Sequence, residues 1–176
     1  MNKELIQLIK RVSSLVSKLP DETDRSWLVT TYLSLKKASA YNYKKDAFSK
    51  LAKSNQDAIL LKINSLDPRK LSVTEKDWIA GYFFNNAMFR IVALAEIGLI
   101  ILFEKKEKKQ APRDYRLLSQ WYEKTFTMKL KKVQLARKRV NKFKHEPRSA
   151  VKNKKYETMR EGIDAFKELL SLLEQI

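Results

Sequence analysis

The chain has 176 residues, of which 44% are hydrophobic, with 3 Gly, 4 Pro and a formal net charge of +17. This length suits one domain, and so little Gly and Pro argues against a sheet protein with many tight turns. The absence of cysteine excludes disulfides, zinc–thiolate sites and thiol catalysis, and a single histidine argues against a His-rich metal site within one chain.

The charge implies a polyanionic partner, with nucleic acid first and an anionic membrane surface second. The N-terminus carries Glu4 and no unbroken apolar core, so it does not read as a secretory signal. The longest apolar run, 91–103, is interrupted by Glu96 and is too short to span a bilayer. We therefore expect a soluble, cytoplasmic protein with no cofactor.

Two amphipathic helices are predicted at the start of the chain. The first has apolar residues at steps of three and four and ends at Pro20; these residues are Leu5, Leu8, Val12, Leu15 and Leu19. Residues 21–24 supply capping side chains for the second, whose apolar face holds Trp27, Thr31, Leu35 and Ala38. Segment 39–53, rich in Tyr and Lys, could stack bases or cover the bundle. A further helix is expected around Ala58, Leu61 and Leu66.

A central helix is predicted from Trp78 to Phe103, opened by a sequence at 74–77 that resembles a capping box. It is apolar nearly all round, so we expect it in the middle of a bundle. Its polar residues should bond across the bundle or to a second subunit; they are Asn85, Asn86, Arg90 and Glu96. Residues 104–110 read as a solvated end, and Pro112 as the break that follows.

The next predicted helix runs from Asp114 to near His145, because Pro147 disfavours helical conformation at the residue before it. Its apolar stripe consists of Leu118, Tyr122, Phe126, Leu130, Val133, Ala136, Val140 and Phe143. A last helix is expected from about Ser149. The fold class is therefore all-α: a single domain over residues 1–176, an antiparallel bundle of about five or six helices.

Basic residues are concentrated in one window. Residues 129–155 hold twelve Lys or Arg against one acid, Glu146, which is +11 of the net charge of +17. Such a run is typical of a solvated face, but it also suits contacts with a nucleic-acid backbone. The candidates for those contacts are Lys131, Lys132, Lys138, Lys142, Lys144, Arg148, Lys152, Lys154 and Lys155. On the predicted helix, Lys131, Lys132, Lys138, Arg139 and Lys142 fall off the apolar stripe and should face outward.

The same window contains the single histidine, His145, close to Arg137, Arg139 and Asn141. An imidazole exchanges a proton near neutral pH, and guanidinium groups hold phosphate oxygens and stabilise developing charge. This combination suits cleavage of a phosphodiester. If the helix continues through Phe143, Arg137, Asn141 and His145 lie on roughly one face and Arg139 points elsewhere. Both arginines remain candidates.

Residues 139–145, R-V-N-K-F-K-H, resemble the signature of HEPN domains, and 85–96 resemble the long helix of bacterial HEPN proteins. The resemblance covers roughly residues 75–175, with the helices of 2–66 packed on that core. In the commonest form of the signature the Arg directly precedes the polar residue, whereas here Val140 stands between Arg139 and Asn141.

The resemblance implies a metal-independent endoribonuclease that dimerises so that two motifs meet. His145 would act as acid or base, Arg139 or Arg137 would hold the phosphate, and Asn141 would orient the ring or the phosphate. A symmetric dimer would supply two histidines, one for each proton transfer. The implied setting is a toxin–antitoxin or antiphage system, with RNA as substrate and a nucleotidyltransferase-like antitoxin or another defence protein as partner.

Three other hypotheses stay open on the residues. The first is a non-catalytic HEPN-like protein that binds RNA or a partner protein. The second is an unrelated basic helical protein whose affinity for nucleic acid follows the lysines of 129–155. The third is a peripheral membrane protein that uses its basic face.

Overall fold

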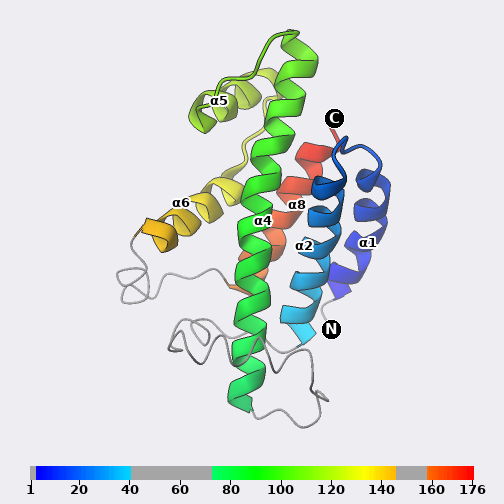
Figure 1. Cartoon of the computed structure of the whole chain (residues 1–176), viewed down its shortest axis with the longest axis vertical. Helices are drawn as coiled ribbons and strands as arrows, with labels where there is room; N and C mark the ends of the chain where they lie inside the picture. The colour runs from blue at the N-terminus through cyan, green and yellow to red at the C-terminus, as the bar shows by residue number, and fades with distance from the viewer. Residues whose placement is uncertain (1–2, 41–72, 146–157) are drawn as a thin grey trace.

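The computed structural model describes residues 3–40, 73–145 and 158–176; within these ranges the side chains of 73–75, 77–78 and 142–145 are not described. Every regular element in the described ranges is a helix, so the all-α prediction is confirmed (Figure 1). The helices are α1 (Lys3–Val16), α2 (Glu22–Ala40), α4 (Val73–Glu107), α5 (Tyr115–Phe126), α6 (Lys131–His145) and α8 (Met159–Leu173). The helix expected at 58–66 and segment 41–53 lie outside the described residues.

Helix α4 is the axis of the bundle. Its 35 residues span about 50 Å, and it packs against α2, α5, α6 and α8. In Figure 1, α1 and α2 lie on one side of α4 and α5 and α6 on the other. Helix α8 contacts α1, α2, α4 and α6, so the first and last described helices share one core. That core is one continuous cluster of buried side chains from Leu5 to Leu173.

Helices α1 and α2 confirm the predicted pattern. All five residues of the first stripe are buried, including Leu19 just beyond the helix end. Asp21 caps α2, because its Oδ1 accepts hydrogen bonds from the backbone N–H groups of Thr23 at 2.7 Å and Asp24 at 3.3 Å. The prediction for Trp27 is wrong: it lies in the first turns of α2 with 37% of its surface exposed.

The predicted bounds of the central helix are wrong at both ends. Helix α4 already includes Val73, so Thr74 lies inside the helix rather than at its N-cap. At the other end the helix continues through Glu107, four residues into segment 104–110, which was expected to be a solvated end or a loop. Charged residues are good helix formers, and the backbone turns only at Lys108, whose φ is 55°.

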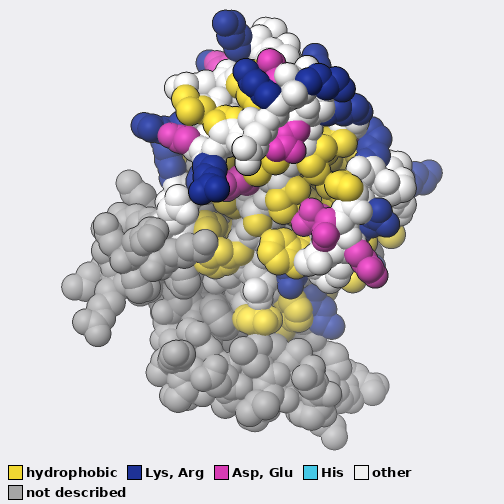
Figure 2. Space-filling view, turned by 45° about the horizontal axis from the view of Figure 1, so that its top comes forward, with side chains coloured by type: hydrophobic (Ala, Val, Ile, Leu, Met, Phe, Trp, Pro, Cys, Tyr) yellow, Lys and Arg dark blue, Asp and Glu magenta, His cyan; other side chains and the backbone are white. Residues whose placement is uncertain are grey.

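One side of α4 is half-exposed, so this helix is not buried all round as expected. The four polar residues lie on or beside that side. Arg90 Nη1 donates to Ser34 Oγ of α2 at 3.4 Å, Asn86 Nδ2 donates to the Tyr82 carbonyl at 3.1 Å, and Glu96 faces Arg137 of α6. Figure 2 shows apolar side chains exposed through the middle of the visible face, with Lys and Arg side chains gathered around its upper end.

Among the described residues, one segment, Ile79–Glu107, is long and apolar enough to cross a membrane by length and composition. It is longer than the apolar run 91–103 recognised in the sequence, because it begins at Ile79 and ends at Glu107. Just over half of its most apolar window is buried inside the bundle. A place at the centre of a helical core accounts for this composition without a bilayer.

The helix predicted from Asp114 to His145 is two helices. Asp114, the expected start of this helix, is the N-cap of α5, since its side chain accepts the Arg116 backbone N–H at 2.7 Å. At Thr127 the backbone enters the left-handed region with φ 55°, which ends α5 and starts the turn that leads to α6. The apolar stripe continues across this break, because Leu130 and Val133 are buried like Tyr122 before it.

Helix α8 packs very closely against α4. A Cβ built on Gly162 would lie 2.5 Å from Cε2 of Phe84, a side chain that is 1% exposed. Glycine is therefore required at this contact for steric reasons. Thr158 caps the helix in a capping box with Glu161, which defines where α8 begins.

Candidate functional site

The basic helix α6 is held in place from its first turn. Glu168 of α8 accepts hydrogen bonds from the backbone N–H groups of Lys132 at 2.7 Å and Val133 at 3.0 Å through one oxygen. A carboxylate from another helix thus caps the N-terminus of α6. Burial raises the pKa of Glu168 above its ordinary value, and the two backbone hydrogen bonds offset only part of that rise.

Arg139 does not face outward as predicted. Its Nη1 lies 3.6 Å from Oε2 of Glu161 at the start of α8, and 25% of its side chain is exposed. Burial by itself raises the pKa of Glu161, but the Thr158 N–H and the nearby Arg139 charge outweigh this effect, so the pKa lies below its ordinary value. One of the two candidate arginines therefore joins α6 to α8.

Arg137 points to the other side of α6, toward α4 and α5. Its guanidinium carbon lies 4.0 Å from the ring centre of Tyr115, and its Nη2 lies 3.9 Å from Oε2 of Glu96. The stacking is a cation–π contact, while the distance to Glu96 exceeds a hydrogen bond. Burial raises the pKa of Tyr115 to about 12, although the Arg137 charge acts in the opposite direction.

Two buried polar atoms in this contact have no hydrogen-bond partner among the described residues: the Tyr115 hydroxyl and Arg137 Nε. Tyr115 as a whole is only 7% exposed. A buried donor without a partner costs free energy, so such atoms mark a place where the fold is not optimised for its own stability.

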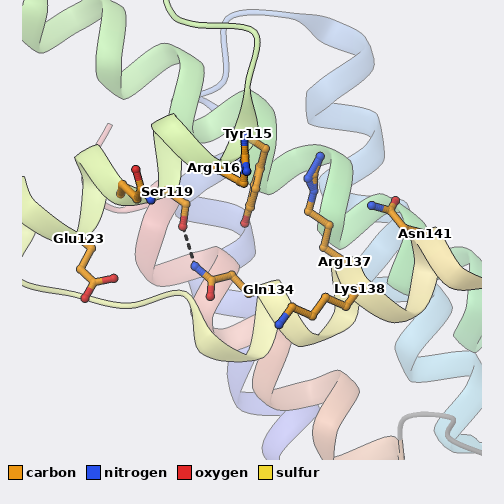
Figure 3. Close-up of a pocket in the computed structure, with 9 residues that line it drawn as sticks. Tyr115, Arg116, Ser119, Glu123, Gln134, Arg137, Lys138 and Asn141 are labelled. Carbon is orange, nitrogen blue, oxygen red and sulfur yellow. Dashed lines mark hydrogen bonds between the residues drawn. The ribbon is translucent and has the colours of Figure 1, made fainter.

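A pocket of about 330 Å³ opens between α5 and α6 beside these two residues (Figure 3). Helix α5 lines it with Tyr115, Arg116, Ser119, Gln120 and Glu123. Helix α6 lines it with Gln134, Arg137, Lys138 and Asn141. The pocket therefore gathers three of the residues that the sequence singled out, Arg137, Lys138 and Asn141, and excludes Arg139.

The continuity of α6 decides how the candidate residues are arranged. The helix is unbroken to His145, as the condition for a shared face required. Arg137 and Asn141, four residues apart, line the same pocket and project from the same side of α6 (Figure 3). Backbone position 145 follows Asn141 by one further turn, although the His145 side chain is not described. The prediction that Arg139 points elsewhere is confirmed.

The described lysines of the basic window, Lys131, Lys132 and Lys138, are exposed on α6 as predicted. The side chains of Lys142 and Lys144 lie outside the description, and so do Arg148, Lys152, Lys154 and Lys155. Helix α6 carries a strong positive charge, because its sequence contains several Lys and Arg residues and no acidic residue.

Six pocket residues were missed in the sequence: Tyr115, Arg116, Ser119, Gln120, Glu123 and Gln134. Gln134 Nε2 donates to Ser119 Oγ at 2.6 Å and ties α6 to α5 (Figure 3). The sequence offered only a weak indication of these residues. Ser119 is 7% exposed and interrupts an otherwise apolar buried face, and a buried hydroxyl implies a polar partner on a facing element.

Comparison of this chain with known proteins does not identify a family. The chain matches no protein-family model, no curated protein and no solved structure. The HEPN resemblance therefore rests on the sequence of residues 139–145 and 85–96 alone. No group of three or more His, Cys, Asp or Glu that could hold a metal ion occurs within residues 3–40, 73–145 and 158–176.

Proposed function

We propose that this chain is a metal-independent endoribonuclease of the HEPN type, with Arg137, Asn141 and His145 as its catalytic residues. One observation carries the proposal: Arg137 and Asn141 line a single pocket on a helix that continues unbroken to position 145. Arg139 then has a structural role through Glu161. Arg137 becomes the arginine that holds phosphate.

The chemistry follows from the residue types. A base removes the proton from the RNA 2′-hydroxyl, whose oxygen attacks the adjacent phosphorus, and the bond to the 5′-oxygen breaks as an acid protonates it. The products are a 2′,3′-cyclic phosphate and a 5′-hydroxyl. His145 serves as acid or base, and a homodimer supplies a second copy for the other transfer. Arg137 binds the phosphate, and Asn141 orients the ring or the phosphate.

Charge supports RNA as the substrate. The exposed Lys131, Lys132 and Lys138 lie on the same helix as the pocket and would follow the RNA backbone. Arg137 makes a long contact of 3.9 Å with Glu96 and stacks on Tyr115 at 4.0 Å, and neither contact is a hydrogen bond that a phosphate would have to replace. A cytoplasmic toxin or antiphage component, with a nucleotidyltransferase-like antitoxin or other defence protein as partner, is the setting we propose.

The test is incubation of the purified protein with total RNA and tRNA in EDTA. We expect cleavage by the wild type, none by His145→Ala, and strong loss in Asn141→Ala and Arg137→Lys, which keeps the charge but loses the planar fork. Lys124→Ala, at an exposed lysine of α5 that does not line the pocket, is the control for a substitution outside the pocket. Induced expression in bacteria should arrest growth for the wild type and not for His145→Ala.

A second candidate is a non-catalytic HEPN-like protein that binds RNA or a partner. The observation that favours it is that both arginines already face carboxylates of their own chain, Glu96 and Glu161. This candidate predicts RNA binding that weakens steeply with salt, no cleavage, and a His145→Ala variant that binds normally. Equal background from wild type and His145→Ala, with RNA still shifted on a gel, would replace the nuclease by this candidate.

A further inference from the structure

The pocket between α5 and α6 has an unusual wall. Tyr115 is buried, yet its hydroxyl lacks a partner among the described residues, and so does the Arg137 Nε beside it. Figure 3 shows the Tyr115 side chain extending from α5 toward α6 in the space between the two helices. Both groups can donate a hydrogen bond, and a ligand with acceptor atoms would satisfy them. A fold that keeps such atoms at a pocket wall is better suited to a bound state than to the free one.

The rest of the lining indicates which ligand fits. Lys138 adds positive charge at the exposed rim, where Arg116 is also exposed but is paired with Asp114 at 3.0 Å. The one carboxylate of the lining, Glu123, is already paired with Lys129. Donors and cations therefore dominate, which suits an anion rich in acceptor atoms.

Uncharged groups make up the remainder. Gln134 and Ser119 are joined by their 2.6 Å hydrogen bond, which fixes both side chains and leaves the side-chain oxygen of Gln134 to accept from another partner. Gln120 and Asn141 contribute two more amides. Amide and hydroxyl groups also bind phosphate oxygens, but a side-chain amide both donates and accepts hydrogen bonds and can therefore recognise the edge of a nucleobase as well. A volume of about 330 Å³ is at the small end of ligand pockets, enough for one nucleotide.

We propose that this pocket binds one nucleotide of the RNA, with its 3′-phosphate against Arg137 and Lys138 and its base against Tyr115 and Gln134. This inference rests on the proposed nuclease function and deepens it. This 3′-phosphate is the one that is cut, because backbone position 145 lies one turn beyond Asn141 on the same helix. The pocket therefore sets the base preference of cleavage.

The first test is a titration of the protein with the four 3′-mononucleotides and with inorganic phosphate, followed by NMR chemical shifts of the α5 and α6 amides. We expect at least one nucleotide to bind roughly tenfold more tightly than inorganic phosphate, because the base adds hydrogen bonds. Shifts should centre on Tyr115, Ser119 and Gln134. Equal affinity for phosphate and for all four nucleotides would overturn the base-binding part and with it the inference.

The decisive variant is Tyr115→Phe, with Tyr122→Phe on the same helix as its control. The Tyr122 hydroxyl already contacts Met128 Sδ at 3.8 Å and does not line the pocket. We expect Tyr115→Phe to bind the preferred nucleotide about five- to tenfold more weakly. At the same time its Tm without ligand should be unchanged or higher, since a buried unpaired hydroxyl is removed. Weaker binding with a lower Tm, or unchanged binding, would contradict the proposal.

Measurements of RNA cleavage distinguish the nucleotide pocket from the proposed nuclease function. Cleavage by the wild type with the same base preference in Tyr115→Phe and Gln134→Ala would overturn the nucleotide pocket and leave the nuclease standing. Nucleotide binding that needs Tyr115, without any cleavage, would overturn the nuclease while the pocket remains. A shifted or relaxed base preference in both variants, with Tyr122→Phe like the wild type, is the expected result.

Discussion

Arg139 Nη1 lies 3.6 Å from Glu161 Oε2, and the same oxygen accepts the Thr158 backbone N–H at 2.6 Å. A residue of the predicted catalytic signature thus contributes to the N-terminal cap of the last helix. The ion pair is partly buried, with 25% and 32% of the two side chains exposed. Its position makes Arg139 a link between α6 and α8 and leaves the pocket to Arg137.

We expect Arg139→Ala to lower the free energy of unfolding by about 1–2 kcal/mol, between the values for exposed and buried pairs. Cleavage per folded molecule should be little changed, whereas Arg137→Lys should lose cleavage with a smaller loss of stability. Urea unfolding and RNA cleavage on the same preparations measure both. A fully folded Arg139→Ala protein without cleavage would assign the catalytic role to Arg139 instead.

Glu168 should be important for the placement of α6 through its oxygen rather than its charge. Glu168→Ala removes the acceptor for two backbone N–H groups, and we expect a loss of about 1–2 kcal/mol in the free energy of unfolding. Glu168→Gln keeps an oxygen and avoids burying a charge, so its stability at pH 7 should stay close to that of the wild type. Chemical unfolding of the two variants tests this, and equal destabilisation by both would show that the charge itself is needed.

Acid should destabilise the protein partly through Glu161. Its pKa is lower in the folded chain than the ordinary value of 4.5, so the stabilisation is present above that value and is lost as the pH falls through the folded pKa. Glu168 has the opposite sign, because its raised pKa lets the folded chain take up a proton first. As the pH falls from 6 to 3, the free energy of unfolding should therefore decrease less steeply for Glu161→Gln than for the wild type, and more steeply for Glu168→Gln. The same slope in both variants would contradict these shifts.

Thr127 holds a left-handed conformation that a β-branched residue adopts at a cost, with φ 55° at the end of α5. We expect Thr127→Gly to raise the free energy of unfolding by about 1 kcal/mol. Thr125→Gly, inside α5, should instead lower the free energy of unfolding by roughly a few tenths of a kcal/mol, because glycine weakens a helix interior. Thermal unfolding compares the two, and a loss of stability in both would show that Thr127 is not strained.

The sequence was sufficient where one helix face determines the outcome. The spacing from Leu5 to Leu19 led directly to a buried stripe, and Asp21 and Asp114 were recognised as helix caps because capping is a contact between close neighbours in the chain. The shared face of Arg137 and Asn141 was also predictable. It depends only on the helical repeat, once the helix is known to be continuous.

The break at Thr127 could not be read from the sequence, because Thr carries no turn signal and the apolar residues keep their steps of three and four through Phe126, Leu130 and Val133. The half-exposed side of α4 escaped prediction for a related reason. An apolar helix is equally consistent with burial on all sides and with packing on most of them.

By itself the sequence determined an all-α chain, its first helices and caps, and the concentration of positive charge around the single histidine. Tertiary structure alone decided between the two arginines, since it placed Glu161 against one and Tyr115 and Glu96 against the other. It also formed the pocket, by folding α5 back against α6 so that Ser119 meets Gln134. The physical reason is that periodicity defines a residue's face on its own helix, whereas its partners depend on which helices pack against that face.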